Sequence, residues 1–353
     1  MSWLEEEPVR GGYPAIEFLG LSGVDRMRAA VKGAMPRPPI HHLFGLTPIS
    51  SGVASSVFSM PASPRLQSGA GVFLAGTAAL VSDAPLGSAV LSPLGPGQIA
   101  ITSDLTLNYL RPVSVRSRQL VSRARPIEVG RRVGLSEAII EDGHGEAVAH
   151  ATSRCFIRQL PHSEGALPTS TDPPTYEGPD PHERAPSTAP LPPDTWSGHS
   201  FLDICDAMNR GELDIPPFAE FFGFTEMNAK EGYFETTAPS SPWFSSPAGT
   251  IYGGFLAYLV DSVLTGAIST VLESGFTCAP LDLKVNFLRP VLPDGRPIEA
   301  SATVVHRGRN LMLAEGQIVN ADGKLVVKAT SSATAIEGKA WLASVIDDAP
   351  ETD

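Results

Sequence analysis

Two aspartates and one pair of glycines are the residues of this sequence that are best placed to do chemistry. Gly253 and Gly254 stand where an apolar helical pattern begins, and Asp261 follows Gly253 by eight residues. The first turn of a helix carries free N–H groups and partial positive charge, both of which stabilise an oxyanion. An ionised carboxylate nearby can act as a general base or as a nucleophile. A second aspartate, Asp83, occurs in an earlier part of the chain.

The spacing of these residues excludes a site formed within a single helix. At ~1.5 Å per residue, Asp261 would lie roughly 12 Å beyond Gly253 along the helix axis. An antiparallel partner helix would instead bring its own aspartate beside the start of the first helix. We therefore predict composite sites, each with a helix start from one part of the chain and an aspartate from another.

An internal repeat supplies the partner helix. Residues 105–113 read LTLNYLRPV and residues 283–291 read LKVNFLRPV, at an offset of 289 − 111 = 178 residues. The same offset pairs Asp83 with Asp261 without a gap. This long period rejects a solenoid of short repeats. The duplicated units span about residues 24–157 and 202–336.

The repeat and the composition divide the chain into five expected segments. The region between the two copies is rich in Pro, Ser, Thr and Asp, a composition that buries too little apolar surface to offset the entropy of ordering. We expect it to be a linker, partly extended as polyproline II. The segments are an N-terminal segment 1–23, a first domain 24–157, the linker 158–198, a second domain 199–340 and a C-terminal tail 341–353.

Within each copy, the pattern predicts a short helix, a strand, a long helix and then a run of strands. In the second copy, residues 252–272 carry apolar side chains at helical spacing. The strands expected after this helix are rich in β-branched residues and are separated by turn signals. Their ranges are 281–288, 298–306, 310–320 and 324–336. The fold class is thus α+β, with an antiparallel sheet wrapped around one long central helix.

Residues 249–261 read GTIYGGFLAYLVD, which resembles the HGG-x4-L-x-D signature of PaaI-like hotdog thioesterases. Residues 282–291 and 304–309 also resemble strand motifs of that family. The resemblance implies a tandem, or double, hotdog fold that forms a pseudo-dimer within one chain and hydrolyses acyl-CoA thioesters. It also implies that an amide at the Gly-Gly helix start polarises the thioester carbonyl. The aspartate would activate water or form an anhydride, and both roles stay open.

The two copies depart from the family signature in different ways. The histidine of the signature is Tyr252 in the second copy, and the three corresponding residues of the first copy are Leu74, Ala75 and Gly76. The copies are therefore not expected to be equivalent.

Two composite sites follow from the repeat. Site A combines Gly253, Gly254 and Ser246 with Asp83 and Thr102, and site B combines Ala75, Gly76 and Ser68 with Asp261. The hydroxyl of Thr102 would help to hold the water, whereas the matching residue Pro280 has no donor. We therefore favour site A. One feature opposes this choice: Pro85, two residues after Asp83, is expected to kink that helix or to end it early.

Further residues are candidates for binding the substrate. Arg131 and Arg309 fall in corresponding hairpin turns and are candidates for binding the CoA phosphates. Trp243 precedes the long helix and is a candidate wall of an acyl pocket, and Tyr252 stands beside the Gly-Gly pair. We expect no bound cofactor and no metal, because CoA enters as part of the substrate.

Composition restricts the remaining possibilities. The net charge of −12 opposes binding to nucleic acid, and no apolar run is long enough to cross a bilayer. The N-terminus is acidic and lacks a secretory pattern, so we expect a cytoplasmic protein. Its three cysteines are scattered and suggest neither disulfides nor a zinc site. We also predict a homodimer of tandem chains.

Two other enzyme classes fit the sequence less well. Hotdog hydratases use a histidine near the carboxylate, but Ser88 and Gly266 stand five residues after the aspartates. A serine hydrolase is disfavoured because no G-x-S-x-G motif occurs. The remaining alternative is a non-catalytic protein that binds or senses acyl-CoA, in which the duplicated cavity persists without turnover.

Overall fold

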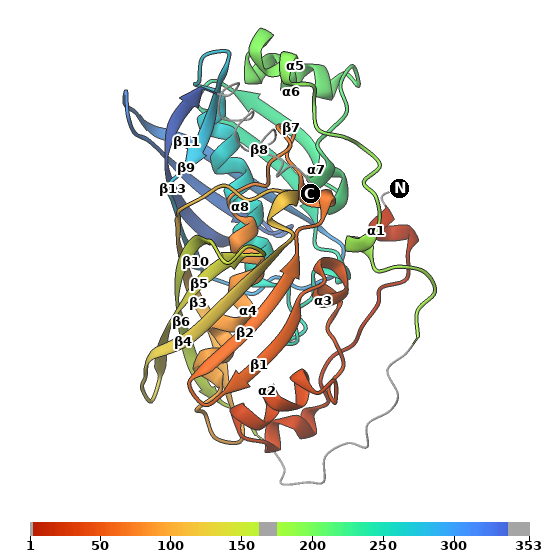
Figure 1. Ribbon diagram of the computed structural model, residues 1–353, viewed down its shortest axis with the longest axis vertical. Helices are drawn as coiled ribbons and strands as arrows, with labels where there is room; N and C mark the ends of the chain where they lie inside the picture. Colours follow the sequence, from red (N-terminus) through yellow and green to blue (C-terminus); the bar gives the residue numbers. More distant parts are fainter. Residues whose placement is uncertain (1–2, 162–174, 338–353) are drawn as a thin grey trace, which may run out of the picture.

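The computed structural model describes residues 3–161 and 175–337, arranged as two similar halves (Figure 1). The first half contains three short α-helices, a hairpin, a long helix and four further strands. Its elements are α1 Trp3–Glu6, η1 Ile16–Gly20, α2 Gly23–Val31, α3 Pro39–Phe44, β1 Thr47–Gly52, β2 Ser55–Pro61, η2 Pro64–Leu66, α4 Thr77–Leu91, β3 Gln98–Tyr109, η3 Val115–Ser117, β4 Gln119–Val129, β5 Val133–Asp142 and β6 Ala147–Gln159.

The second half repeats this order, except that two successive strands take the place of β3. Its elements are η4 Pro181–Glu183, α5 Pro193–Gly198, α6 Phe201–Asn209, α7 Pro217–Phe222, β7 Thr225–Lys230, β8 Tyr233–Pro239, η5 Pro242–Phe244, α8 Gly253–Ser269, β9 Phe276–Pro280, β10 Asp282–Phe287, β11 Pro297–Arg307, β12 Met312–Val319 and β13 Leu325–Glu337.

The offset of 178 residues found in the sequence also relates the elements. It carries α2 onto α6, α3 onto α7, β2 onto β8 and β6 onto β13 with the same bounds. The α+β class, the long helix and the strands that follow it are confirmed. The expectation of one strand before the long helix is wrong, because each half has a hairpin there, β1–β2 and β7–β8.

One continuous antiparallel sheet of 13 strands joins the halves. The joint is the pairing of β3 with β10, in which Thr106 lies opposite Lys284 and Leu105 opposite Val285. Thr106 and Lys284 are themselves repeat partners, so a pseudo-twofold axis passes through this pair. Figure 1 shows the sheet wrapping around the two long helices.

The long helices α4 and α8 form the core and contact each other across the pseudo-twofold axis. Nearly every residue of α8 is buried, in keeping with its apolar sequence. In α4, Pro85 lies inside the helix, which nevertheless continues to Leu91. The expectation that Pro85 ends the helix early is therefore wrong.

The second part of the predicted linker is packed against the first domain. Asp180 forms ion pairs with Arg10 at 2.9 Å and with His42 at 3.0 Å. Leu191 is buried, and its amide donates a hydrogen bond to the carbonyl of Gly69. Of the described residues 175–198 only Pro181 and Leu191 are buried, so the segment buries little surface, as expected, and a few tertiary contacts hold it. Residues 162–174 lie outside the described part of the chain.

Across the described ranges, no helix combines the length and the hydropathy that a bilayer span requires.

Candidate active site

Each central helix places its aspartate at the start of the other helix. The amide of Gly254 donates a hydrogen bond of 2.9 Å to Oδ2 of Asp83. The amide of Gly76 donates one of 2.8 Å to Oδ2 of Asp261. Each aspartate thus lies at the start of the helix of the other half, and the catalytic use of these two pairs stays a prediction.

Both carboxylate oxygens of Asp83 accept hydrogen bonds within the protein. Besides the bond from Gly254, the hydroxyl of Thr102 donates to Oδ1 at 3.1 Å. A Cβ atom added at Gly253 would lie 2.8 Å from Oδ2 of Asp83, so only glycine allows this close approach. The groups predicted for site A are thus assembled around a carboxylate that is only 6% exposed as a residue.

Tyr252 closes one side of site A. Its buried hydroxyl accepts a hydrogen bond of 2.9 Å from the amide of Ala84 and donates one of 3.0 Å to the carbonyl of Leu80. These two backbone groups would bond to each other in an unbroken helix, so the hydroxyl is inserted into the ladder of α4 just before Pro85. Tyr252 therefore joins the two halves, and this arrangement does not direct its hydroxyl to a substrate.

Site B differs in the state of its carboxylate. Oδ1 of Asp261 is buried and has no hydrogen-bond partner among the described residues. The hydroxyl of Tyr109 faces Asp261 from β3, but it too is buried without a partner in hydrogen-bond geometry within that part of the chain. Ala75 begins the turn into α4, and its amide donates to none of the described acceptors. Site B thus has three polar groups without a partner in hydrogen-bond geometry among the described residues, although the Tyr109 hydroxyl lies close enough to Asp261 to lower its pKa.

Burial controls the ionisation of both carboxyls. It raises the pKa of Asp261 to about 7, against the opposing effects of the Gly76 amide and the Tyr109 hydroxyl. It raises the pKa of Asp83 to about 6, against the opposing bonds from Gly254 and Thr102. Each carboxyl can consequently exchange a proton near neutral pH, as a general base must.

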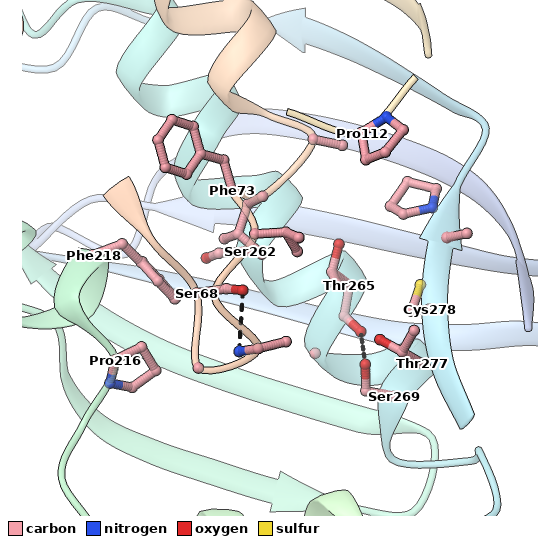
Figure 2. A pocket seen from close by; sticks show the side chains of 18 of the residues that line it. Ser68, Phe73, Pro112, Pro216, Phe218, Ser262, Thr265, Ser269, Thr277 and Cys278 are labelled. Atoms are coloured by element: carbon pink, nitrogen blue, oxygen red, sulfur yellow. Dashed lines mark hydrogen bonds between the residues drawn. The ribbon is translucent and has the colours of Figure 1, made fainter. Parts of the chain in front are cut away.

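A cavity of about 350 Å³ lies beside site B. Figure 2 shows its walls: the loop before α4 with Ser68 and Phe73, α8 with Ser262 and Thr265, and β9 with Cys278. Apolar and aromatic side chains dominate the lining, and Ala75 and Tyr109 belong to it. The lining includes Ser68, Ala75 and Tyr109, but neither Asp261 and Gly76 of site B nor the site A residues Asp83, Thr102, Gly253, Gly254 and Ser246.

Several predicted binding residues lie elsewhere. Ser68 and Ser246 each accept a hydrogen bond from the amide two residues later, so both stabilise a loop turn, and only Ser68 lines the cavity. Trp243 is fully buried beside the ring of Trp3 and does not line this cavity, so its expected role as a wall of the acyl pocket is wrong here.

The two hairpin arginines are on the surface. Arg131 and Arg309 are exposed at the β4–β5 and β11–β12 turns and are not among the cavity residues. Their contact with CoA phosphates stays a prediction.

Comparisons with known proteins agree with this architecture. The thioesterase superfamily model matches residues 71–149 and 248–327, one match in each half. Over 95 residues, the chain is 34% identical to a Haemophilus influenzae protein that bears the name of an esterase; the match covers 27% of this chain and 67% of that protein. The chain belongs to the thioesterase superfamily.

Solved structures resemble this superfamily member in fold. A hotdog-fold protein from Alicyclobacillus acidocaldarius has 16% identity and a TM-score of 0.51, covering 85% of this chain and 98% of that one. A thioesterase-type structure from Novosphingobium aromaticivorans has 14% identity and a TM-score of 0.50, covering 81% of this chain and 97% of that one. At these identities the likeness concerns the fold alone, which is a tandem of two hotdog units.

Sequence reasoning missed two groups of residues in this superfamily member. Trp196 lines the cavity from the predicted linker, and Phe201 lines it from α6. Tyr109 reaches site B from the other half of the chain. A signal for Tyr109 was present in the repeat, because its partner is Phe287, which lacks the hydroxyl.

Proposed function

We propose that this protein hydrolyses acyl-CoA thioesters at site B, with Asp261 as the general base. The observation that carries the proposal is that Oδ1 of Asp261 has no partner in hydrogen-bond geometry among the described residues, at a site whose Ala75 and Tyr109 line a cavity of about 350 Å³. Membership in the thioesterase superfamily supports thioester hydrolysis as the reaction class. Site A has the expected groups, but its carboxylate oxygens are both bonded within the protein.

The size and lining of the cavity suit the acyl part of the substrate. At the ~30 Å³ that one molecule occupies in liquid water, the cavity has room for on the order of ten non-hydrogen atoms. Phe73, Phe218 and Phe234 contribute aromatic surface, and Arg111, the charged residue of the lining, is exposed and already paired with Glu146 at 3.1 Å. The expected acyl group is uncharged, of medium length or with one aromatic ring.

The reaction follows from the position of the polar groups. Asp261 accepts a proton from water while the water oxygen bonds to the thioester carbon, which converts the carbonyl oxygen to an oxyanion. The free amide of Ala75 at the start of α4 is the donor placed to stabilise that oxyanion. The carbon–sulfur bond then breaks, the proton passes from Asp261 to the CoA sulfur, and the free acid leaves.

The test is to incubate the protein with a panel of acyl-CoAs and to follow the release of free thiol. We expect Asp261→Asn to abolish turnover and Asp83→Asn to retain most of it. Loss of turnover in Asp83→Asn alone would move the reaction to site A. Binding of acyl-CoA by wild-type protein without any turnover would favour the sensing alternative and would contradict the proposal.

A further inference from the structure

Site B lacks the hydroxyl that site A has beside its carboxylate. At site A, Thr102 of β3 donates to Asp83 of the same half. The repeat partner of Thr102 is Pro280, which ends β9 and carries no donor. The two positions are equivalent in the sheet. Thr102 lies opposite Cys155, and Pro280 lies opposite Ala333, which is the residue that corresponds to Cys155 in the second half.

Tyr109 brings a hydroxyl to site B from the other half. It is the last residue of β3, and its amide donates a hydrogen bond of 2.9 Å to the carbonyl of Leu281, at the break between β9 and β10. This bond fixes the backbone of Tyr109 beside the position that Pro280 leaves without a hydroxyl. Site A cannot receive a hydroxyl from the other half in the same way, because the residue that corresponds to Tyr109 is Phe287.

The hydroxyl of Tyr109 lies close enough to Asp261 to lower the pKa of that carboxyl, yet neither this hydroxyl nor the buried Oδ1 has a partner in hydrogen-bond geometry within the described part of the chain. A buried polar atom without a partner costs free energy, so two such atoms that face each other mark a position for a bridging molecule. Tyr109 lines the cavity that we assign to the acyl group. The bridging position therefore lies between the base and the substrate.

We propose that Tyr109 is a catalytic residue of site B whose hydroxyl holds the attacking water together with Oδ1 of Asp261. The inference rests on the proposed function of site B and adds a residue from the opposite half to it. Tyr109 binds the water and exchanges no proton in the net reaction. Burial and the nearby Asp261 hold the pKa of Tyr109 well above its usual value, which keeps the phenol protonated.

The groups around Asp261 decide how a pH profile is interpreted. Tyr109 faces it from β3, Tyr258 from the preceding turn of α8 and Cys278 from β9. Burial and Asp261 raise the pKa of all three, so they stay neutral at neutral pH. The group that titrates near pH 7 in this cluster is Asp261.

The experiment compares Tyr109→Phe with wild-type protein in steady-state hydrolysis between pH 5 and pH 9. We expect kcat to fall about tenfold or more, as when one donor is removed from a reacting centre. KM should change little, and the midpoint of the kcat profile should rise, because the Tyr109 hydroxyl lowers the pKa of Asp261. Tyr258→Phe is the matched control, because its buried hydroxyl lacks a partner among the described residues and does not line the cavity.

A second variant separates loss of chemistry from loss of structure. Adding Pro280→Thr to Tyr109→Phe places a hydroxyl where Thr102 stands in the other half, and it should restore part of kcat. Binding of a non-hydrolysable thioether analogue of acyl-CoA, measured by calorimetry, should be unchanged in all variants. The inference would be overturned by an unchanged kcat and midpoint in Tyr109→Phe, or by an equal loss of kcat in Tyr258→Phe. Asp261→Asn tests the proposed function of site B separately.

Discussion

Oδ2 of Asp261 accepts a hydrogen bond of 2.8 Å from the amide of Gly76, across the boundary between the two halves. A Cβ atom added at Gly76 would lie 2.9 Å from the Cβ atom of Asp261, so the approach of the two helices depends on this glycine. The bond orients the carboxylate and leaves the buried Oδ1 without a partner in hydrogen-bond geometry among the described residues. One oxygen thus fixes the base in place and the other is available for proton transfer.

The pH dependence of turnover should follow the ionisation of Asp261. Burial raises its pKa to about 7, and only the ionised form accepts a proton from water. We expect kcat/KM to rise with pH up to about 7 and then to level off. The loss of thioester absorbance measures this without a thiol reagent. Asp83→Asn should keep the same midpoint, and a midpoint near the usual aspartate pKa of about 4 would contradict the assignment.

The free energy of unfolding should also depend on Asp261, but it should fall as pH rises, whereas turnover should increase. The folded-state pKa of Asp261 is above its unfolded value, so the stabilisation is complete below about pH 4 and is lost as pH rises through about 7. The slope for one such group is about −1.4 kcal/mol per pH unit. Asp261→Asn removes this titration, and its melting temperature should exceed that of wild-type protein by more at pH 8 than at pH 4. A difference independent of pH would show that Asp261 does not titrate in this range.

Tyr252→Phe should destabilise the protein through α4. The substitution removes the hydroxyl that bonds to Ala84 and Leu80 and leaves two backbone groups without that partner. We expect a loss of about 1–3 kcal/mol in the free energy of unfolding, measured with denaturant. Tyr258→Phe is the control, since its hydroxyl has no partner in the described ranges and its removal should cost little. Equal stabilities of the two variants would mean that the insertion into α4 contributes nothing.

Filling the cavity should change substrate preference. Thr265 is a half-buried residue of α8 that lines the cavity, and Thr265→Phe would occupy part of its volume. We expect kcat/KM for medium-length acyl-CoAs to fall about tenfold relative to acetyl-CoA, because larger acyl groups lose apolar contact area. The matched control is Gly87→Ala at the repeat position in α4, where an added Cβ meets only Thr102, at 3.9 Å. Similar losses for short and long substrates would show that the acyl group binds elsewhere.

Much of the architecture could be predicted from the sequence. The offset of 178 residues predicts two copies of one unit, and the structure keeps that offset in almost every element. The length of a helix then requires each aspartate to work with the start of the other helix, and the bonds from Gly254 and Gly76 have this arrangement. These features follow from the periodicity of the sequence and from the geometry of a helix, so they can be predicted without the tertiary structure.

The difference between the two sites was decided by the tertiary structure. The sequence favoured site A for Thr102 and the glycine pair, but the cavity and the free carboxylate oxygen lie at site B. Tyr252 closes one site, and Tyr109 reaches the other through the joint of β3 and β10. Such contacts depend on side chains from segments far apart in the chain, so neither the spacing of residues nor their periodicity could specify them. The sequence therefore determined which helix starts face which aspartates, and packing between the halves determined which of these two pairs has a cavity beside it.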